Sequence, residues 1–499
     1  MLQIQKNSIA AFYDRLHEEV RLAEKLVYRL DEKTPLEKLS DGLFAKREDR
    51  SKIRSYKWRG AFFKLHRLLD EGYHGPFIAA SAGNHAQGVA LAAAHLGVQA
   101  TIFMPTTTPK VKVQSVRKFG GKSVEVRLSG DSYDAAAQQA QSMANKLGGC
   151  MIKPFDDLSI IAGQATIGLE LFSQCPDLER LFVPIGGGGM ASGVAFAAKK
   201  ILRHPCRIIG VEVEQQNGMQ LSIKCGQPIA IERPDLFCDG TAVQKPGSYT
   251  FEICNDLLDD IVSVTNEQVS AAMREAWNQY RMLPEPSGAI GLSAAFSSQQ
   301  NSDDLKSAVI ISGGNIDFQT LPRVVRMANT TKNERRFFRF TIQERNGSLI
   351  DLLDVFSKDL NIVDFQYGKT DSDMAHPILG IEGPTEQINA LLQNPDLQST
   401  DVNETSGNAL SEFRVIPFRP DLCQSAIFLK VDIPNRPGAL RDMMRQISHT
   451  TNICYFNFME SGELEGHALI GFELLNVKSE YLIRKALFEL GLKFQIAQS

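Results

Sequence analysis

Short apolar runs alternate with alanine-rich stretches of helical character between about residue 50 and residue 320. The runs are FIAAS, ATIFMP, SVEVRL, LFVPIG, RIIGVEVE and AVIISG. This alternation predicts an α/β fold in which parallel strands are joined by crossover helices. Several runs end in glycine or serine, and ligands of open α/β sheets bind outside the carboxyl ends of the strands. We therefore expect a functional site at these strand ends.

The pattern changes at residues 329–334, where the polar stretch NTTKNE predicts a linker. Beyond it the chain repeats itself at a constant offset: Ile342 matches Ile433 and Gly347 matches Gly438, 91 residues apart in both cases. Each copy predicts a strand, a tight glycine loop, an amphipathic helix and two more strands. The last third of the chain is therefore expected to be one small α+β unit present twice.

Length and composition narrow the class of protein. A chain of 499 residues is too long for one ordinary core and indicates roughly three folding units. An apolar content of 43% and a formal net charge of -4 are typical of a soluble protein with no general attraction to nucleic acid or anionic membranes. No apolar stretch is long enough to span a bilayer and no signal peptide is evident, so a cytoplasmic location is expected. The eight cysteines lie far apart, which indicates reduced thiols and neither a disulfide framework nor a metal site.

Lys57 stands between two aromatic residues in SYKWRGAF, residues 55–62, at the predicted start of a helix. Taken alone, such a lysine is usually a solvated side chain that lies along an apolar stripe. In an apolar pocket, however, desolvation lowers the pKa of the amine, and such an amine can form a Schiff base with a cofactor aldehyde. The role of Lys57 therefore depends on the segments that surround it.

The segment SAGNHAQG, residues 81–88, joins the apolar run PFIAA to the helical stretch VALAAAHLG. A helix that begins here directs unpaired backbone N–H groups and the positive end of its dipole at whatever lies over Ser81 to His85. A substrate carboxylate suits that position. The alternative is an ordinary helix start capped by serine or asparagine, and His85 by itself would more often be structural.

The run LFVPI is followed by four glycines and a methionine, which are Gly186, Gly187, Gly188, Gly189 and Met190. Such a run is costly in chain entropy and fits a loop whose N–H groups approach a phosphate closely. A dinucleotide site is an alternative, because Gly186, Gly188 and Ala191 satisfy a G-x-G-x-x-A pattern. Glu212 or Glu214 then stands near the position of a ribose-binding acid.

Ser312 opens SGGNID, residues 312–317, directly after the apolar strand AVII. A serine at a strand end can be simple turn chemistry. Its hydroxyl can also face the pyridine nitrogen of a cofactor.

In this order and context, the four segments resemble the fold-type II pyridoxal-phosphate enzymes, and within them the threonine dehydratases. The similarity extends to TPLEKLSDGLFAKRED before the lysine, DGTAVQKPG at residues 239–247 and EPSGAIGLSA at residues 285–294. It implies a catalytic region of two open twisted α/β subdomains. Relatives commonly have phenylalanine before the lysine, leucine or phenylalanine after it, and alanine in place of Ser287. Those departures could reshape the pocket without removing a catalytic group.

The resemblance implies roles for individual residues. Lys57 would hold pyridoxal 5'-phosphate through its amine, Asn84 would hydrogen-bond the ring hydroxyl oxygen, and Ser312 would meet the pyridine nitrogen. The substrate carboxylate would lie at the loop formed by Ser81, Ala82, Gly83, Asn84 and His85. The phosphate would be cradled by the backbone of Gly186, Gly187, Gly188, Gly189 and Met190.

The resemblance also implies the conversion of L-threonine to 2-oxobutanoate and ammonia, with Lys57 removing the α-proton as general base. A serine at the pyridine nitrogen, unlike an aspartate, would not keep that nitrogen protonated. The ring is then a weaker electron sink, which favours elimination over racemisation or transamination. L-Serine should react as well, because one methyl group in a pocket discriminates by only about 1 to 3 kcal/mol.

The two C-terminal copies resemble the ACT-like regulatory modules of biosynthetic threonine dehydratases, which bind isoleucine as feedback inhibitor and valine as its antagonist. Gly347 and Gly438 occupy the turn at which such modules admit an amino acid close to the backbone. A homotetramer and a place in isoleucine biosynthesis are also implied. The alternative is a purely structural pair of modules that assembles the oligomer. The expected domains are a catalytic region at 1–330 with a smaller subdomain at about 50–155, a linker at 331–335, and ACT-like modules at 336–420 and 421–499.

Three other functions stay open at this point. A serine racemase or a sulfhydrylase would yield D-serine or a thioether in place of a keto acid. An amino-acid sensor would bind isoleucine without turnover, which the intact Lys57 disfavours. A dinucleotide enzyme would leave SYKWRG, SAGNH and SGGNID unexplained.

Overall fold

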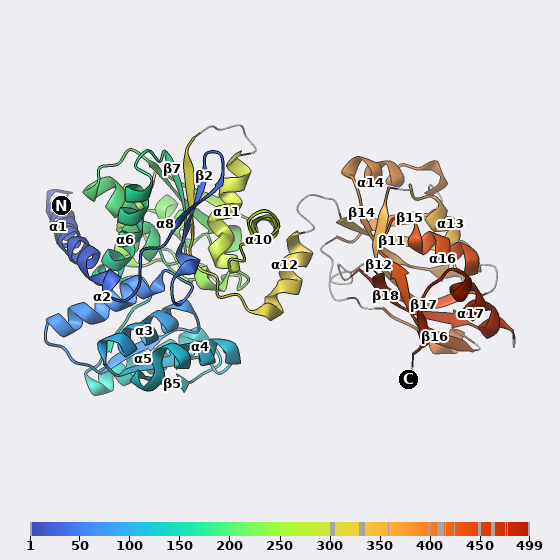
Figure 1. Cartoon of the computed structure of the whole chain (residues 1–499), viewed down its shortest axis with the longest axis horizontal. Coiled ribbons are helices and arrows are strands. Elements are labelled where there is room, and N and C mark those ends of the chain that lie inside the picture. Colours follow the sequence, from blue (N-terminus) through green and yellow to red (C-terminus); the bar gives the residue numbers. More distant parts are fainter. Residues whose placement is uncertain are drawn as a thin grey trace. The chain divides into compact units, whose positions relative to one another are not determined.

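The computed structural model divides into two compact units, Met1–Ala328 and Asn329–Ser499 (Figure 1). Residues 331–334 of the expected linker lie outside the described residues. No helix in the described part of the chain is both long enough and apolar enough to cross a bilayer. The structure describes residues 2–299, 305–328, 335–357, 359–397, 400–406, 414, 416–423, 425–447, 451–460, 465–474, 476 and 478–497.

A six-stranded sheet forms one layer of the first unit, with the order β1-β2-β10-β7-β8-β9. Its strands are β1 (Leu36–Ser40), β2 (Leu43–Arg47), β7 (Arg180–Pro184), β8 (Arg207–Val213), β9 (Asp260–Val264) and β10 (Ser307–Ile311). The pairs from β2 to β9 are parallel, whereas β1 and β2 form an antiparallel hairpin at one edge. The hairpin lies before residue 50 and was not part of the predicted alternation.

A second, four-stranded parallel sheet has the order β5-β4-β3-β6. Its strands are β3 (Phe77–Ala80), β4 (Ala100–Met104), β5 (Val124–Leu128) and β6 (Cys150–Met151). All six apolar runs read from the sequence are strands, which confirms the predicted α/β fold with two parallel sheets. The alternation by itself did not show how the runs divide between the sheets.

Helices surround both sheets of the first unit, with α3, α4 and α5 gathered beside the smaller one (Figure 1). The helices are α1 (Leu2–Leu26), α2 (Lys57–Asp70), α3 (Asn84–Leu96), α4 (Lys110–Gly120), α5 (Tyr133–Leu147), α6 (Leu158–Gln174), α7 (Gly189–Phe196), α8 (Gly218–Cys225), α9 (Ser248–Leu257), α10 (Asn266–Tyr280), α11 (Pro286–Gln299) and α12 (Leu321–Ala328). Helix α2 packs against both α3 and α6, so it connects the layers of the two sheets.

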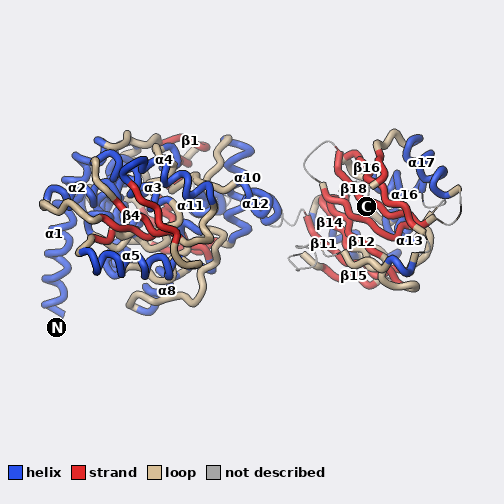
Figure 2. The backbone as a smooth tube through the Cα atoms, turned by 90° about the horizontal axis from the view of Figure 1, so that it is seen from below, coloured by secondary structure: helices blue, strands red, loops and turns tan. Residues whose placement is uncertain are grey.

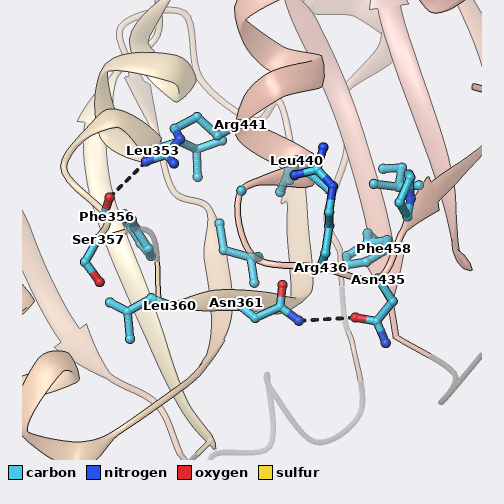
Figure 3. A pocket seen from close by; sticks show the side chains of 15 residues that line it. Leu353, Phe356, Ser357, Leu360, Asn361, Asn435, Arg436, Leu440, Arg441 and Phe458 are labelled. Atoms are coloured by element: carbon cyan, nitrogen blue, oxygen red, sulfur yellow. Dashed lines mark hydrogen bonds between the residues drawn. The ribbon is translucent and has the colours of Figure 1, made fainter. Parts of the chain in front are cut away.

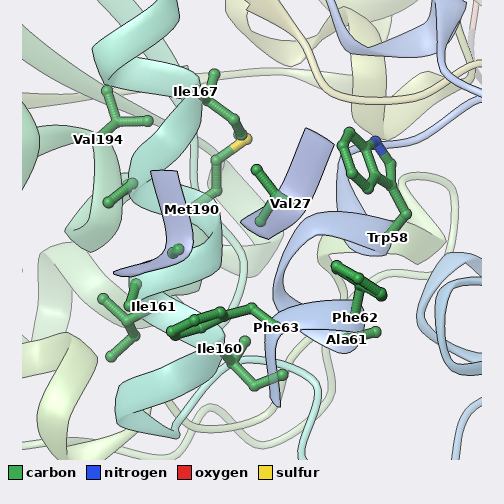
Figure 4. Packing of buried hydrophobic residues seen from close by; sticks show 14 of the residues in the cluster. Val27, Trp58, Ala61, Phe62, Phe63, Ile160, Ile161, Ile167, Met190 and Val194 are labelled. Atoms are coloured by element: carbon green, nitrogen blue, oxygen red, sulfur yellow. The ribbon is translucent and has the colours of Figure 1, made fainter. Parts of the chain in front are cut away.

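The core of the first unit fixes α2 through its apolar face. Trp58, Phe62 and Phe63 are buried there, in one cluster with side chains of α6 and α7 (Figure 4). Gly60 and Gly163 let the two backbones touch, because a Cβ on Gly163 would lie 2.6 Å from the Cα of Gly60. A helix held this closely along its length presents its first residue in a defined place.

The described strands of the second unit form one nine-stranded sheet, with the order β13-β11-β14-β12-β17-β18-β16-β19 and β15 paired to β11 (Figure 2). The first copy contributes β11 (Arg335–Gln343), β12 (Asn361–Gly368), β13 (Met374–Ala375), β14 (Ile378–Glu382), β15 (Asp401–Glu404), α13 (Ser348–Asp354) and α14 (Thr385–Leu392). The second copy contributes β16 (Ala426–Pro434), β17 (Ile453–Met459), β18 (Glu465–Glu473), β19 (Phe494–Ile496), α16 (Ala439–Ile447) and α17 (Ser479–Glu489). The predicted strand, glycine loop, helix and two strands are confirmed in both copies, which join through the antiparallel pair β12 and β17.

Candidate functional site

The predicted segments meet at the carboxyl ends of the six-stranded sheet. Strands β7 and β10 are parallel neighbours, so the glycine loop after β7 and Ser312 after β10 leave the sheet at the same edge. The backbone N–H of Tyr56 donates to the carbonyl of Ser312 at 3.2 Å, which places the start of α2 beside that strand end. From the other side α3 approaches so closely that a Cβ on Gly88 would lie 2.9 Å from the Lys57 carbonyl oxygen.

Lys57 is the first residue of α2, as the sequence predicts. Its Nζ donates a hydrogen bond to the carbonyl of Pro154 at 3.0 Å. Burial lowers the pKa of the Lys57 amine to about 8, against the opposing charge of Glu285. An amine with this pKa is partly neutral near pH 7, and only the neutral amine is a nucleophile or a base.

A buried ion cluster anchors α2 two residues beyond Lys57. The Arg59 guanidinium donates to Glu48 at 2.9 Å and to Glu170 at 2.5 Å, and Lys46 donates to Glu170 at 2.6 Å. All four side chains are 2% exposed or less. Because buried charges are tolerated only when they are paired and hydrogen-bonded, this cluster holds α2 in one register against α6.

The glycine loop lies between β7 and α7 and has no room for side chains. A Cβ on Gly187 would overlap the ring of Phe155, and a Cβ on Gly186 would lie 2.9 Å from the Cα of Thr241. None of the N–H groups of residues 186–190 donates a hydrogen bond to another described segment. The glycines are therefore needed because neighbouring residues press on the loop, and the loop keeps its N–H groups available for an anion.

The 81–85 loop connects β3 to α3, with Asn84 as the first helical residue. No side chain caps α3, since the Ser81 hydroxyl accepts from the N–H of Gly83 at 3.2 Å. The open helix start favours the carboxylate position over an ordinary capped helix. His85 is buried and its Nε2 lies 2.8 Å from the carbonyl of Ile152, while burial lowers its pKa to about 3. The imidazole is thus neutral and donates through Nε2.

Ser312 is buried at the end of β10, and its hydroxyl donates to the carbonyl of Ser287 at 3.3 Å. The hydroxyl of Ser287 is buried and has no hydrogen-bond partner among the described residues. The hydroxyls of Ser312 and Ser287 therefore both have capacity left for a further hydrogen bond near the end of β10.

Glu285 and Asn315 also belong to this site, although the sequence patterns assign a role to neither. Asn84 Nδ2 donates to Glu285 Oε1 at 2.6 Å, and Asn84 Oδ1 accepts from Asn315 Nδ2 at 2.7 Å. Burial raises the pKa of Glu285 to about 7. The signal in the sequence is their position: Glu285 opens EPSGAIGLSA and Asn315 lies within SGGNID, and both segments carry part of the family resemblance.

The residues present fit pyridoxal phosphate. The amine of Lys57, the unpaired N–H groups of the glycine loop and the hydroxyl of Ser312 surround one edge of the sheet. The alternative of a dinucleotide site fits less well. In that alternative a carboxylate such as that of Glu212 would bind the ribose, but Glu212 already accepts from the N–H groups of Met219 and Gln220 at the start of α8. When bound, the cofactor supplies an electron sink for charge that develops at the substrate α-carbon.

Comparison with known proteins decides the family. A family model described as "Pyridoxal-phosphate dependent enzyme" matches residues 27–313, more than half of the chain. The "L-threonine dehydratase biosynthetic IlvA" of Pasteurella multocida is 34% identical over 467 residues, which cover 90% of this chain and 89% of that protein. The chain belongs to the biosynthetic threonine dehydratases.

Other members of this threonine dehydratase family and related solved structures agree. The protein of the same description from Escherichia coli strain K12 is 33% identical over 93% of this chain and 92% of its own length. The processed form of threonine deaminase isoform 2 from Solanum lycopersicum has a TM-score of 0.60 and 38% identity, covering 63% of this chain and 88% of that chain. Maize serine racemase reaches a TM-score of 0.57 with 32% identity, over 62% of this chain and 96% of that chain. The catalytic fold is thus shared between dehydratases and racemases, whereas the dehydratase match extends over the C-terminal unit.

In this threonine dehydratase the C-terminal unit carries an open pocket between the two copies of the repeat, of about 410 Å³ when open solvent is included (Figure 3). Apolar side chains from both copies line it, and Arg441 donates to the carbonyl of Phe356 at 3.0 Å. Asn361 donates to Asn435 at 3.2 Å across the pocket. The Nε of Arg441 is buried and has no hydrogen-bond partner among the described residues. The pocket therefore combines an apolar lining with a guanidinium group that has a buried N–H without a hydrogen-bond partner among the described residues.

A second pocket of about 270 Å³, open solvent included, contains the counterparts of Phe356, Asn361 and Arg441 in the other copy, which are Ile447, Asn452 and Ile350. It includes Gly347 where the first has Gly438, and Ile350 where the first has Arg441. Both glycines have a positive φ, +89° and +81°, a backbone conformation that favours glycine at the strand-to-helix turn. The two pockets are thus equivalent in backbone and different in charge.

Proposed function

We propose that the protein is a threonine ammonia-lyase that converts L-threonine to 2-oxobutanoate and ammonia, the first committed step of isoleucine biosynthesis. The observation that carries the proposal is the Lys57 amine, whose pKa is lowered by burial and which lies beside the strand end that holds Ser312. The names of the relatives that match about 90% of the chain support the choice of threonine as substrate.

In this proposal each predicted residue contributes to binding the cofactor or the substrate. Lys57 holds pyridoxal phosphate, Asn84 bonds its ring oxygen, and Ser312 faces its ring nitrogen without a charge. The N–H groups of residues 186–190 hold the phosphate, which suits the dipole of α7. The open start of α3, at Ser81, Ala82, Gly83, Asn84 and His85, receives the substrate carboxylate.

Lys57 has a second task as general base. With the cofactor bound, the Lys57 amine would take the α-proton of the substrate, and the β-hydroxyl would leave as water together with a proton. A pKa of about 8 suits this task, because a base is most effective when its pKa lies near the working pH. L-Serine is expected as a secondary substrate, since it lacks only one methyl group.

The test is direct. The purified full-length protein should bind pyridoxal phosphate, show a visible absorbance band and release keto acid from L-threonine. Lys57→Ala should lose the band and the activity, while Lys64→Ala, which removes a lysine further along α2, should keep both. A wild-type protein that binds no pyridoxal phosphate would refute the proposal, and production of D-serine without keto acid would favour a racemase.

We also propose that the C-terminal unit binds isoleucine as inhibitor and valine as its antagonist, in a homotetramer. The two pockets support this proposal, because each has a glycine turn, a helix start and an aliphatic lining of the kind that a branched amino acid fills. An effector can act only if it binds one global state better than another, typically by about 1 to 3 kcal/mol.

Turnover of L-threonine with isoleucine, valine or both would test the regulation, and light scattering would test the tetramer. Isoleucine should inhibit, and valine should relieve the inhibition. Unchanged turnover at saturating isoleucine would leave the modules with a structural role only. A cytoplasmic location is the remaining part of the proposal, and the names of two plant relatives place those proteins in the chloroplast.

A further inference from the structure

Asn84, Glu285 and Asn315 close a ring of three hydrogen bonds at the candidate active site. Asn84 Nδ2 donates to Glu285 Oε1 at 2.6 Å, and Asn315 Nδ2 donates to Asn84 Oδ1 at 2.7 Å. The backbone N–H of Asn315 completes the ring by donating to Glu285 Oε2 at 3.1 Å. The ring joins the start of α3 to the segments before α11 and after β10, so it ties together parts of the chain that carry both sheets.

The carbonyl of Ile53 determines which side-chain atoms of the ring donate and which accept. Asn315 Nδ2 also donates to the carbonyl of Ile53 at 2.7 Å, and a carbonyl can only accept. The amide nitrogen of Asn315 is therefore assigned, and it faces Asn84, which must accept with its oxygen. That orientation turns Asn84 Nδ2 toward Glu285. The orientation of the Asn84 amide is thus determined by its neighbours.

Only a carboxylate completes this ring. Residue 285 must accept twice, from the side chain of Asn84 and from a backbone N–H that cannot be reversed. A glutamine at this position has one acceptor and would leave two donors facing each other in either orientation. Gly313 makes room for the carboxylate, because a Cβ there would overlap Glu285 Oε1. Glu285 is 5% exposed, so water cannot readily supply the missing bond.

We propose that Glu285 is a positioning residue that fixes the Asn84 amide so that its second N–H is left for the ring oxygen of pyridoxal phosphate. This inference rests on the proposed function of Lys57 and Asn84. The ring uses one hydrogen of Asn84 Nδ2 and the amide oxygen Oδ1, which leaves a single donor free. Burial and the charge of Asp239 raise the pKa of Glu285 to about 7, so the ring is complete in the ionised form of Glu285, above that pH.

Glu285→Gln removes one hydrogen-bond acceptor from residue 285 and keeps the shape of the side chain. Full-length protein freed of cofactor is titrated with pyridoxal phosphate and followed by absorbance. We expect the dissociation constant to rise about tenfold, the effect of one buried donor left without its partner. Glu212→Gln is the matched control, because Glu212 is also buried and also accepts two backbone N–H groups. The control should lose thermal stability to a similar degree and keep its affinity within about threefold.

A double variant, Asn84→Asp with Glu285→Gln, separates positioning from mere stability. The new aspartate can accept from Asn315 and from the new glutamine, while the glutamine oxygen accepts from the backbone N–H of Asn315, so the ring closes again. The melting temperature should recover toward the wild-type value. The affinity for pyridoxal phosphate should stay low, because the side chain at position 84 no longer carries an N–H. This variant also keeps the test decisive if Glu285→Gln does not fold.

The outcomes are distinct for the two proposals. If the wild-type protein binds no pyridoxal phosphate, the proposed function fails. If the wild-type protein binds it and Glu285→Gln binds equally well, the positioning role of Glu285 is wrong and the proposed function stands. Recovery of both stability and affinity in the double variant would equally overturn the positioning role.

Discussion

Gln366 on β12 lies opposite Asn457 on β17, and the two residues are 91 positions apart, so each faces its own counterpart in the other copy of the repeat. An antiparallel pair in this register has an approximate two-fold axis between the two residues. The axis relates the two C-terminal pockets, since every residue of the smaller one except Asn346 has its counterpart in the larger. The Arg345 to Asp351 and Arg436 to Asp442 ion pairs obey the same relation. The difference in charge between the pockets therefore comes from side chains such as Arg441 and Ile350.

This asymmetry predicts which pocket binds the carboxylate of an amino acid. Arg441→Met keeps the apolar stem and removes the guanidinium, so isoleucine binding should weaken about tenfold or more through loss of a charge-assisted hydrogen bond. Ile350→Met changes the equivalent position of the smaller pocket and should leave the affinity within about twofold. Calorimetric titration of the full-length variants with isoleucine measures both. The opposite ranking would assign the effector to the smaller pocket.

The pKa of Lys57 predicts how cofactor loading depends on pH. Burial lowers this pKa to about 8, so the neutral, nucleophilic amine is lost as the pH falls below that value. The rate at which cofactor-free protein regains its visible absorbance should rise about tenfold per pH unit up to pH 8 and then level off. Glu285→Gln removes a charge that raises the pKa, so its plateau should begin at a lower pH. A wild-type rate that still climbs toward pH 10 would contradict the prediction.

Gly187→Ala should damage the phosphate loop. The added Cβ would overlap Phe155, and overpacking of this kind costs about 1 to 3 kcal/mol of unfolding free energy. Affinity for pyridoxal phosphate should fall as well, because the N–H groups of the loop move with the backbone. Gly218→Ala is the control, since its Cβ would make an ordinary contact of 3.4 Å with Pro246. Urea unfolding should separate the variants, and equal stability would show that the loop can yield.

Arg59→Met should be strongly destabilising, because it leaves Glu48 buried without an ion-pair partner and leaves Glu170 paired with Lys46 alone. Breaking a buried pair in this way costs about 3 to 5 kcal/mol. Arg67→Met is the matched control on the same helix, where the guanidinium pairs with Glu19 and the largely exposed Glu71. That loss should cost less than the loss of Arg59, because the Arg67 side chain is 23% exposed and that of Glu71 is 55% exposed, so water can solvate part of this pair. Similar midpoints of urea unfolding for the two variants would contradict an anchoring role of the buried cluster.

The hairpin of β1 and β2 has a sequence signal of its own, which the alternation of apolar runs does not include. Strands β1 and β2 are joined at Asp41 and Gly42, a dipeptide that favours tight hairpin turns. Both strands are short and carry charged residues, so they do not stand out as apolar runs. The second strand matters to the site, since β2 pairs with β10, the strand that ends at Ser312.

The sequence by itself determined the elements and the residue types that carry chemistry. Periodicity predicted the parallel strands, and the offset of 91 residues predicted two copies of one α+β unit, because both are local properties of the chain. Lys57, the glycine loop and Ser312 could be picked out because they stand at strand or helix ends.

The tertiary structure alone decided which of these residues meet. Asn84 and Glu285 are 201 positions apart and touch only because α2 packs against both α3 and α6, which brings the two sheets to one edge. The pairing of Gln366 with Asn457 likewise depends on two edge strands finding a common register. Such contacts depend on the packing of whole elements, which the local pattern of polar and apolar residues does not specify.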